Sequence, residues 1–461
     1  METKTLRDIP IIRWFVFALV VTLTFATYWF QDFFSGLKPL MESELKISST
    51  QFGSIIQWTT FANVFGMIII GGIVLDKFGT RIAGPIFAGC AVIGGLMVAT
   101  GASKYFSEDA STNLYLLKFG RLFFGIGLEV VCVIVAKTIA KWFAKGFAFA
   151  MAMNMAFGRM GSAGATAFSI DIAGGTISSA ASFAATLIVI SFVCLLIYLI
   201  FFDGRIDKQL GIKFGAKNLD EDRFKISDLG KIITDRSFIF ITLLCVAFYA
   251  AVFPFIQYCP DLLINKFGFS YELNLNGLDF WQKVGAILTN GPKVTALIPL
   301  GTIIFTPIFG RIVSKKGKAA SLMMLGSGLL IFAHLTLSVL NNVFFGYLGL
   351  LSLGIAFSLL PAAMWPSVAK IVDHKRLGTA YATMFTFQNW GLMALFWGIG
   401  KVLDLSNSAN LEAIHAKQAV YNYTNPILML VGLGVLSIFL AYQLKRADKK
   451  QGYGLENPNT V

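Results

Sequence analysis

Twelve apolar runs of about 20 residues constrain this chain more than any other feature of its sequence. A helix rises about 1.5 Å per residue, so a run of this length crosses the roughly 30 Å hydrocarbon layer of a bilayer. Each run has to be helical, because lipid offers backbone groups no hydrogen-bond partner. Composition agrees, since 56% of the residues are hydrophobic and 14% are charged, against about 25% charged in soluble domains. We expect the spans at 12–36, 51–75, 82–103, 112–136, 146–170, 183–202, 237–259, 292–313, 320–339, 343–369, 377–402 and 425–444.

One polar segment, residues 203–236, divides the runs into two groups of six. It carries charges of both signs and few large apolar side chains, which favours a solvated linker over the alternative of a regulatory domain. Two groups of six spans are typical of transporters built from two half-bundles. The sequence therefore predicts an all-α membrane protein with twelve transmembrane helices in two pseudo-symmetric six-helix bundles. The expected parts are a first bundle at 1–202, a cytoplasmic central loop at 203–236, a second bundle at 237–445 and a cytoplasmic tail at 446–461.

The formal charge of +13 has a topological explanation. When the loops are assigned to alternate sides, 27 of the 38 Lys and Arg lie on the side that holds both termini, and nine lie on the other. This positive-inside bias indicates that both termini and the central loop face the cytoplasm. We therefore do not expect a nucleic-acid surface. METKTLRDIP followed by a long apolar run, without a small-residue cleavage site, indicates a retained first helix.

A repeated loop supports the division into two halves. The pattern GxxxDxxGxR follows the second span, and a degenerate copy, GRIVSKKGK, follows the eighth with Ser314 in place of the acidic residue. Glycine lets helices approach closely in such a turn, and an acidic side chain can face a neighbouring helix N-terminus. One copy is a weak pattern, whereas two copies six spans apart are a strong one. The structural residues predicted in the first copy are Gly72, Asp76, Gly79 and Arg81.

This arrangement resembles the signature loop of the major facilitator superfamily, and Arg121 lies in RLFFGIG, which resembles that superfamily's second motif. Its third motif, a Gly-Pro pair in the fifth span, is absent, and GRMGSAG stands there instead. The stretches GRLFFGIGLEV, FGRMGS, and SLLPAAMWPSVAKIV followed by LGTAYATMFTFQNWGL are similar to the lysosomal dipeptide transporter branch of the superfamily. The similarity covers about residues 20–405, and residues 271–290 look like an insertion. The resemblance implies transport of dipeptides by alternating access, without a cofactor.

Few ionisable groups lie inside the predicted spans. A charge in mid-span costs at least about 2.5–3.5 kcal/mol on insertion scales, so each one needs a physical reason. Helical rise places Arg159 near the middle of the bilayer, at a depth between Arg121 and Glu129. A carboxylate and a guanidinium that face one cavity suit a zwitterion, with Glu129 taking an ammonium group and Arg159 a carboxylate. The alternative is a permanent Glu129–Arg159 pair that only holds two helices together.

The resemblance assigns Glu129 and Arg159 to the two ends of a bound peptide. For Arg121, a structural role or support of proton coupling is favoured over contact with a ligand. Asp32 stands near the outer end of the first span. It is expected either to pair with Arg121 or to sit among the lipid headgroups, in a structural role.

In the second half, aromatic and polar residues replace charge. Trp365 stands between two prolines that can bend its span, where it could stack on substrate side chains or only pack at the bend. Gln388 and Asn389 could bond a peptide group or join helices to each other. Tyr249 is a candidate of the same kind. The substrate-binding residues predicted here are Trp365, Gln388, Asn389 and Tyr249.

The sequence lacks a GxxxxGK[ST] loop and an HExxH motif, so we expect neither an enzyme, nor a metal site, nor a cofactor. We expect a monomeric secondary transporter of dipeptides or similar small zwitterions, working as a uniporter, with a solute and the lipid bilayer as its partners. The alternatives are a proton-coupled symporter of a small organic anion and a non-transporting sensor with this fold. Short loops favour a bacterial cytoplasmic membrane, and a lysosomal membrane applies if the chain is eukaryotic.

Overall fold

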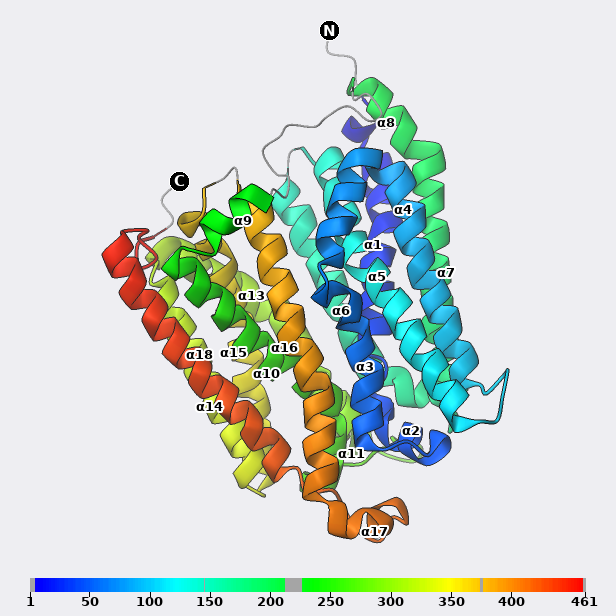
Figure 1. Cartoon of the computed structure of the whole chain (residues 1–461). Coiled ribbons are helices and arrows are strands. Elements are labelled where there is room, and N and C mark those ends of the chain that lie inside the picture. Colours follow the sequence, from blue (N-terminus) through cyan, green and yellow to red (C-terminus); the bar gives the residue numbers. More distant parts are fainter. Residues whose placement is uncertain (1–4, 145, 212–225, 374–375, 459–461) are drawn as a thin grey trace.

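The computed structural model describes residues 5–144, 146–211, 226–373 and 376–458. This part of the chain is helical and contains no strand beyond an isolated bridge between Ser270 and Asn290. Long helices stand side by side, and α1 begins at the same end at which α18 finishes (Figure 1). We call this end the termini side and the other end the opposite side.

The helices of the first half follow the six predicted spans. Their bounds are η1 (Leu6–Asp8), α1 (Pro10–Asp32), η2 (Ser35–Leu37), α2 (Lys38–Leu45), α3 (Ser49–Val64), α4 (Met67–Ala102), α5 (Ala110–Trp142), α6 (Phe147–Ala173), α7 (Ile177–Tyr198), the π-helical turn η3 (Leu199–Asp203) and α8 (Gly204–Gln209).

The second half repeats this pattern. Its bounds are α9 (Ile226–Ile232), α10 (Arg236–Phe267), α11 (Phe280–Leu288), α12 (Gly291–Thr295), α13 (Leu297–Lys316), α14 (Ala319–Val339), α15 (Val343–Ile371), α16 (Leu377–Ser406), η5 (Ser408–Asn410), α17 (Leu411–His415) and α18 (Thr424–Gln451).

The second span is broken. It consists of α3 and the first turns of α4, which are bent by 53° at the intervening residues. Within α4, two helical segments meet at a sharp turn at Gly79, whose φ of 71° is rarely adopted by a residue with a side chain. This turn sends the chain back across the bilayer as the third span. The glycine at this position of the predicted loop is therefore required by its backbone conformation.

Length and hydropathy mark nine helices of the described chain as membrane spans, or ten with the bent pair of α3 and early α4. The remaining two long helices, α6 with 27 residues and α16 with 30, are the less apolar ones. They carry the predicted site residues Arg159 on α6, and Gln388 and Asn389 on α16. These two less apolar spans thus carry three of the predicted substrate-binding residues, whereas Glu129 and Tyr249 lie on the more apolar α5 and α10.

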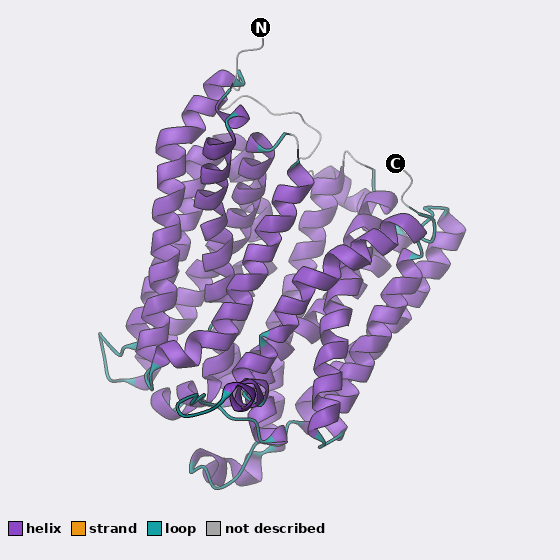
Figure 2. Ribbon diagram, turned by 180° about the vertical axis from the view of Figure 1, so that it is seen from behind, coloured by secondary structure: helices purple, strands orange, loops and turns teal. Residues whose placement is uncertain are grey.

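Each half packs mainly within itself. In the first, α1 contacts α6 and α7, and α4 contacts α5 and α7. In the second, α10 contacts α16 and α18, and α14 contacts α15 and α18. The halves meet where α3 packs on α16 and where α6 packs on α12 and α13. The view from behind shows the long helices of the described chain side by side (Figure 2). Helix–helix contacts of this kind bury the core between the spans.

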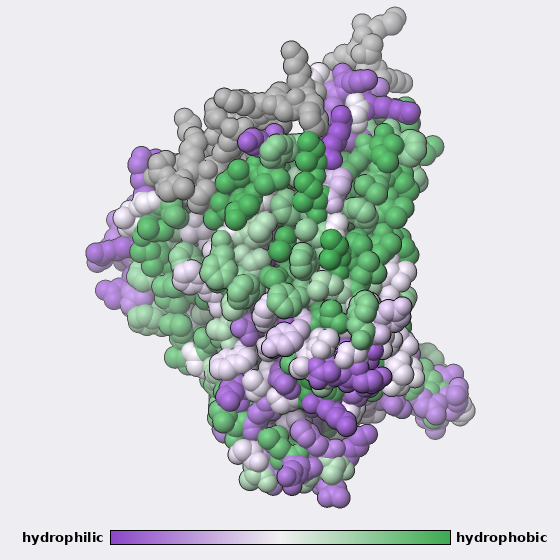
Figure 3. All heavy atoms as spheres, turned by 45° about the vertical axis from the view of Figure 1, so that its right-hand side comes forward, coloured by the Kyte–Doolittle hydropathy of each residue, from purple (hydrophilic) through white to green (hydrophobic). Residues whose placement is uncertain are grey.

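The outer surface carries an apolar band between two hydrophilic ends (Figure 3). Large apolar side chains remain exposed on the outward faces of the long helices, including Ile200, Ile304 and Phe439. Water would make such a surface unfavourable, whereas lipid tails are as apolar as the side chains. The chain is a multi-pass membrane protein.

The predicted central loop at 203–236 and the predicted insertion at 271–290 both contain helical residues. Helix continues from α7 through η3 and α8 to Gln209, past the expected end of the first bundle at 202, and residues 212–225 lie outside the described residues. The division into four parts therefore stays a prediction. The expected insertion at 271–290 contains α11, a helix with no buried residue.

Candidate substrate site and its gate

Arg159 lies on α6 and faces the other half of the molecule. Its side chain is partly buried. The guanidinium carbon lies 4.6 Å from the ring centre of Phe357 on α15 and 6.0 Å from that of Tyr28 on α1. No hydrogen bond or ion pair to Arg159 occurs among the contacts of the described residues. Cation–π contacts thus hold the guanidinium in place and leave its N–H donors available.

Glu129 lies on α5 and also contacts the other half. Its carboxylate is hydrogen-bonded to the side chain of Asn389 on α16, and that amide donates a second bond to the Phe385 carbonyl at 2.9 Å. No ion pair joins Glu129 to Arg159 among the described side chains. Tyr28 lies within electrostatic reach of both groups. The structure therefore brings the two charged residues to one region without pairing them.

A series of contacting aromatic side chains in the second half leads to Arg159. The Trp365 indole donates a hydrogen bond to the Tyr249 hydroxyl at 2.9 Å. Tyr249 stacks on Phe253 with ring centres 5.4 Å apart, and Phe253 meets Phe357 edge to face at the same separation. Because Arg159 lies over Phe357, the aromatic side chains form a continuous series from α15 through α10 to the guanidinium.

Trp365 also contacts two aromatic residues of α16. Its ring stacks on Phe385 with centres 4.9 Å apart, and the Tyr381 hydroxyl donates to the Trp365 carbonyl at 3.3 Å. Gln388 is buried and accepts a hydrogen bond from the Cys245 thiol at 3.4 Å. Of the second-half candidates, Trp365 and Tyr249 belong to the aromatic series and Asn389 contacts Glu129, whereas Gln388 contacts a neighbouring helix.

Asp32 is buried between the halves. It accepts a hydrogen bond from the Ser162 hydroxyl on α6 and another, at 2.7 Å, from the Gln257 amide on α10. Neither expected arrangement applies, because Asp32 forms no ion pair with Arg121 among the described contacts and it is not exposed to headgroups. Its carboxylate is satisfied by neutral donors, so our prediction of its surroundings is wrong. It links α1 to α6 of its own half and to α10 of the second half.

Arg121 is fully buried and binds the end of α1. It donates hydrogen bonds to the carbonyls of Phe30 at 2.6 Å and Gln31 at 2.9 Å. The last carbonyls of a helix have no partner within the helix and attract a cation. Its two terminal nitrogens therefore bind the backbone of α1, while its buried Nε has no hydrogen-bond partner among the described residues.

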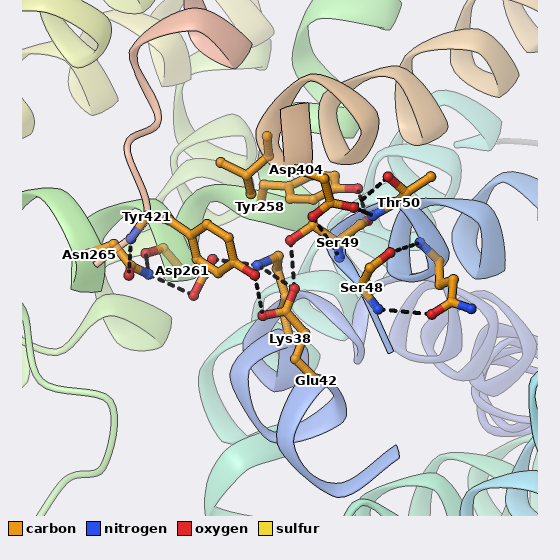
Figure 4. Close-up of polar contacts among 12 residues, drawn as sticks. Lys38, Glu42, Ser48, Ser49, Thr50, Tyr258, Asp261, Asn265, Asp404 and Tyr421 are labelled. Atoms are coloured by element: carbon orange, nitrogen blue, oxygen red, sulfur yellow. Dashed lines mark hydrogen bonds and ion pairs between the residues drawn. The ribbon is translucent and has the colours of Figure 1, made fainter. Parts of the chain in front are cut away.

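The halves are joined at the opposite side by a buried charge cluster (Figure 4). Lys38 on α2 is fully buried, and its ammonium lies 2.7 Å from Asp261 on α10 and 2.9 Å from Glu42. The ring centre of Tyr421 lies 4.3 Å from the same ammonium, and Tyr423 donates its hydroxyl to Asp261. Together these five residues form what we call the gate cluster.

A second joint lies beside the gate cluster, where α3 begins. The backbone N–H groups of Ser49 and Thr50 donate to the Asp404 carboxylate of α16 at 3.2 and 2.8 Å (Figure 4). A carboxylate at a helix N-terminus is stabilised by the helix dipole. The two helices touch, since a Cβ on Gly53 would lie 2.2 Å from the Phe396 carbonyl oxygen. Only glycine permits this approach of α3 to α16.

A third joint connects α6 to α12. Lys293 forms an ion pair with Asp171 and donates to the Ala167 carbonyl at 2.7 Å. The three joints all lie at the opposite side, so this end of the molecule is closed. None of the three joints is predicted from the sequence. The signals that could have revealed the gate cluster are the i,i+4 pair Lys38–Glu42 and a lone acidic residue, Asp261, at the end of an apolar run.

On the termini side, the predicted loop of the first half is held within its own half. Arg81 forms ion pairs at 2.9 Å with Asp203 and Asp207, and Lys141 reaches the same two carboxylates at 2.7 Å. Gly72 faces open space. The side chain of Asp76 lies outside the described part of the structure.

The degenerate loop of the second half is held by the C-terminal tail. The Lys318 N–H donates to the Glu456 carbonyl at 3.0 Å, and Ser321 donates its N–H and hydroxyl to the Glu456 carboxylate at 2.9 and 2.7 Å. Leu455 is fully buried beside them. Glu456 thus places a carboxylate at the N-terminus of α14, although Ser314 has replaced the acidic residue of the loop itself.

Comparison with known proteins agrees with this architecture. The family model described as "Major Facilitator Superfamily" matches residues 20–396. The proteins named "Lysosomal dipeptide transporter MFSD1" are 27% identical in Danio rerio, over 87% of this chain and 82% of the relative, and 26% identical in Homo sapiens, over 95% and 87%. The crystal structure of the nucleoside transporter NupG superposes with a TM-score of 0.65 at 14% identity, covering 94% of this chain and 99% of that one.

A match of this extent includes both halves, and the relatives carry transporter names. The expected twelve-helix fold is confirmed, and the comparisons point to a transporter of a small solute across a membrane and not to an enzyme. The chain belongs to the major facilitator superfamily.

Proposed function

We propose that this transporter moves dipeptides or similar small zwitterions, with Arg159 binding the substrate carboxylate and Glu129 binding its ammonium group. The relatives named dipeptide transporters support this class of substrate. A guanidinium binds a carboxylate through two parallel hydrogen bonds, and a dry site strengthens them. Recognition of the two termini leaves the side chains free, so the specificity for dipeptides is broad.

The free donors of Arg159 carry the proposal. A structural arginine inside the membrane uses its N–H groups on the protein, as Arg121 does with the carbonyls at the end of α1. Arg159 instead has aromatic contacts, which fix its position without using a donor. The aromatic series from Trp365 to Phe357 supplies a wall against which varied substrate side chains can pack.

The position of the joints supports alternating access. Since the halves are closed at the opposite side, a solute would reach Arg159 from the termini side in this state. Rocking the halves about the midplane would open the gate cluster and expose the same residues to the other side.

The test uses purified protein in liposomes and the uptake of a labelled dipeptide. Arg159→Ala is expected to lower uptake at limiting substrate at least about tenfold, because truncating one partner of a desolvated charge pair costs about 2–5 kcal/mol. Arg159→Lys keeps the charge and loses the bidentate geometry, so an intermediate loss is expected. Arg205→Ala removes an exposed arginine on α8 and serves as the matched control.

Substrate analogues separate the two roles. The wild type should transport a dipeptide amide, which lacks the carboxylate, at least about tenfold less well. Arg159→Ala should transport the dipeptide and its amide equally poorly, because the partner of the carboxylate is gone. The wild type should also prefer a dipeptide to an N-acetyl dipeptide, which lacks the ammonium group, and Glu129→Gln should lose this preference. Uptake that Arg159→Ala leaves unchanged would refute the site. Competition by monocarboxylates but not by dipeptides would favour the alternative, an organic-anion symporter.

We also infer uniport. An acidic exterior should not drive accumulation of the dipeptide above its equilibrium level, and accumulation would instead indicate proton coupling. Flux that is absent for every solute, together with ligand-induced stabilisation, would indicate a sensor.

The positive-inside bias supports cytoplasmic termini, so we propose that the termini side faces the cytoplasm. The short loops favour a bacterial cytoplasmic membrane in this proposal. The relatives are named lysosomal, which makes a lysosomal membrane the alternative for a eukaryotic source.

A further inference from the structure

A cavity of about 730 Å³ lies on the termini side, away from the substrate site. It is formed by α9, the start of α10 and the end of α18, which meet at this end of the second half (Figure 1). Its lining includes one acidic residue, Asp235, and four basic ones. The basic residues are Lys231, Arg236, Arg446 and Lys450.

The positive charge of this cavity is not compensated by an ion pair within the part of the chain that the structure describes. No ion pair joins the four basic residues to a carboxylate among the described residues. Asp235 caps α10 by accepting the Phe238 N–H at 2.8 Å, and it accepts further bonds from Gln451 at 2.8 Å and Tyr453 at 2.6 Å. Its oxygens are therefore used by neutral donors, and the basic side chains remain available.

The cavity lies at the depth of lipid headgroups. Helix α18 has 28 residues, which corresponds to about 42 Å, whereas the hydrocarbon layer is roughly 30 Å thick. The last turns of α18, with Arg446 and Lys450, therefore extend beyond the hydrocarbon. Arg236 opens α10 at the same end of the molecule.

The surface next to the cavity is apolar. Ile239 lines the cavity itself and is 37% exposed, and Leu243, one turn further along α10, is 45% exposed. On α18, Phe439 and Tyr442 are 53% and 47% exposed, and the Arg446 guanidinium lies 5.9 Å from the Tyr442 ring centre. A basic cavity thus continues into an apolar, outward-facing surface of two helices.

We propose that this cavity binds the headgroup of an anionic phospholipid, with the acyl chains along the exposed apolar faces of α10 and α18. Lysine and arginine donate charge-assisted hydrogen bonds to phosphate oxygens, and basic pockets between transmembrane helices suit such headgroups. A free phosphate ester would satisfy the basic residues alone, whereas a phospholipid also covers the apolar surface. The bound lipid connects α9 to α10 and α18.

Native mass spectrometry of the full chain in detergent tests the proposal, with phosphatidylglycerol and phosphatidylcholine as probes. We expect phosphatidylglycerol to bind at least fivefold more tightly than phosphatidylcholine. A variant that combines Lys231→Gln, Arg236→Gln, Arg446→Gln and Lys450→Gln should lose this preference. Inorganic phosphate and glycerol 3-phosphate, added as competitors, should displace the lipid only weakly.

The matched control removes the same charge from the same side of the molecule. It combines Arg205→Gln, Lys208→Gln, Lys315→Gln and Lys316→Gln, which are exposed residues outside the cavity. An equal loss of preference in this control would show general electrostatic attraction and overturn the site.

If inorganic phosphate displaced bound phosphatidylglycerol as effectively as added phosphatidylglycerol does, the assignment to a lipid would be overturned. Should the fourfold variant not fold, Arg446→Gln alone should lower the preference about twofold or more, and an unchanged preference would again count against the proposal.

Discussion

The two ends of this transporter are held in different ways. At the opposite side, buried charges on one half contact the other half directly, as Lys38 does with Asp261. At the termini side, the braces found among the described residues stay within one half, with Arg81 bonded to Asp203 in the first and Glu456 of the tail bonded to Ser321 in the second. The contacts at one end have to break for the halves to separate, whereas those at the other end can persist.

This difference identifies the moving part. A buried ion pair has lost its water and contributes strongly only while both partners are in place. The gate cluster therefore suits a joint with two states. In the closed state its charges are paired, and in the open state water hydrates them. The ion pairs of Arg81 lie at a partly exposed surface, where they stabilise one half throughout the cycle and are worth less.

The largest effect is expected from breaking the gate cluster. Lys38→Met leaves Glu42 and Asp261 buried without a cation, so the closed state should lose about 3–5 kcal/mol. The thermal unfolding midpoint in detergent should fall, and cysteines placed in the aromatic series should become reactive from the opposite side. Lys283→Met changes an exposed lysine on α11 and is the control. An unchanged midpoint and unchanged labelling would contradict the gate assignment.

A smaller effect is expected at the brace of the first half. Asp203 is buried and accepts charge-assisted bonds from Arg81 and Lys141, so Asp203→Asn should cost about 1.5–3 kcal/mol of stability. Labelling from the opposite side should not change, because these contacts stay within one half. Asp207→Asn, at a more exposed carboxylate, should cost less. If Asp203→Asn opened the opposite side, the distinction between the two ends would be wrong.

The smallest effect is expected at the tail. Glu456→Gln weakens its bonds to Ser321 at the N-terminus of α14 and should cost about 0.5–1.5 kcal/mol. The tail should become more susceptible to carboxypeptidase, while the gate remains closed. Glu272→Gln changes an exposed acid elsewhere and is the control. Equal digestion of the variant and the wild type would show that Glu456 does not hold the tail.

Much of the fold could be predicted from the sequence, because lipid leaves a long apolar run no alternative to a helix. The predicted span at 51–75 is present but bent by 53°, and 82–103 follows it after the turn at Gly79. Hydropathy averages over a window, so it registers the total length and not a break inside it. The positive φ of Gly79 has no compositional signal beyond the glycine itself.

The candidate site was only partly predictable. The sequence marks Glu129 and Arg159 because a charge inside the bilayer is rare. It leaves open whether they pair with each other, since the depth of two residues does not determine which way their side chains point. Asp32 shows this limit, because its partners Ser162 and Gln257 are distant in sequence and neutral.

By itself, the sequence determined that this chain spans a membrane many times, that it has two halves, and which few charges lie inside. Those properties depend on whether each segment lies in lipid or in water, and the local composition of the segment indicates which. Only the tertiary structure decided that Lys38 is buried against Asp261, that Arg159 keeps its donors free, and that Glu456 holds the loop whose own acidic residue is missing. Each of these depends on helices from distant parts of the chain meeting at a particular angle, and side-chain packing between helices sets that angle.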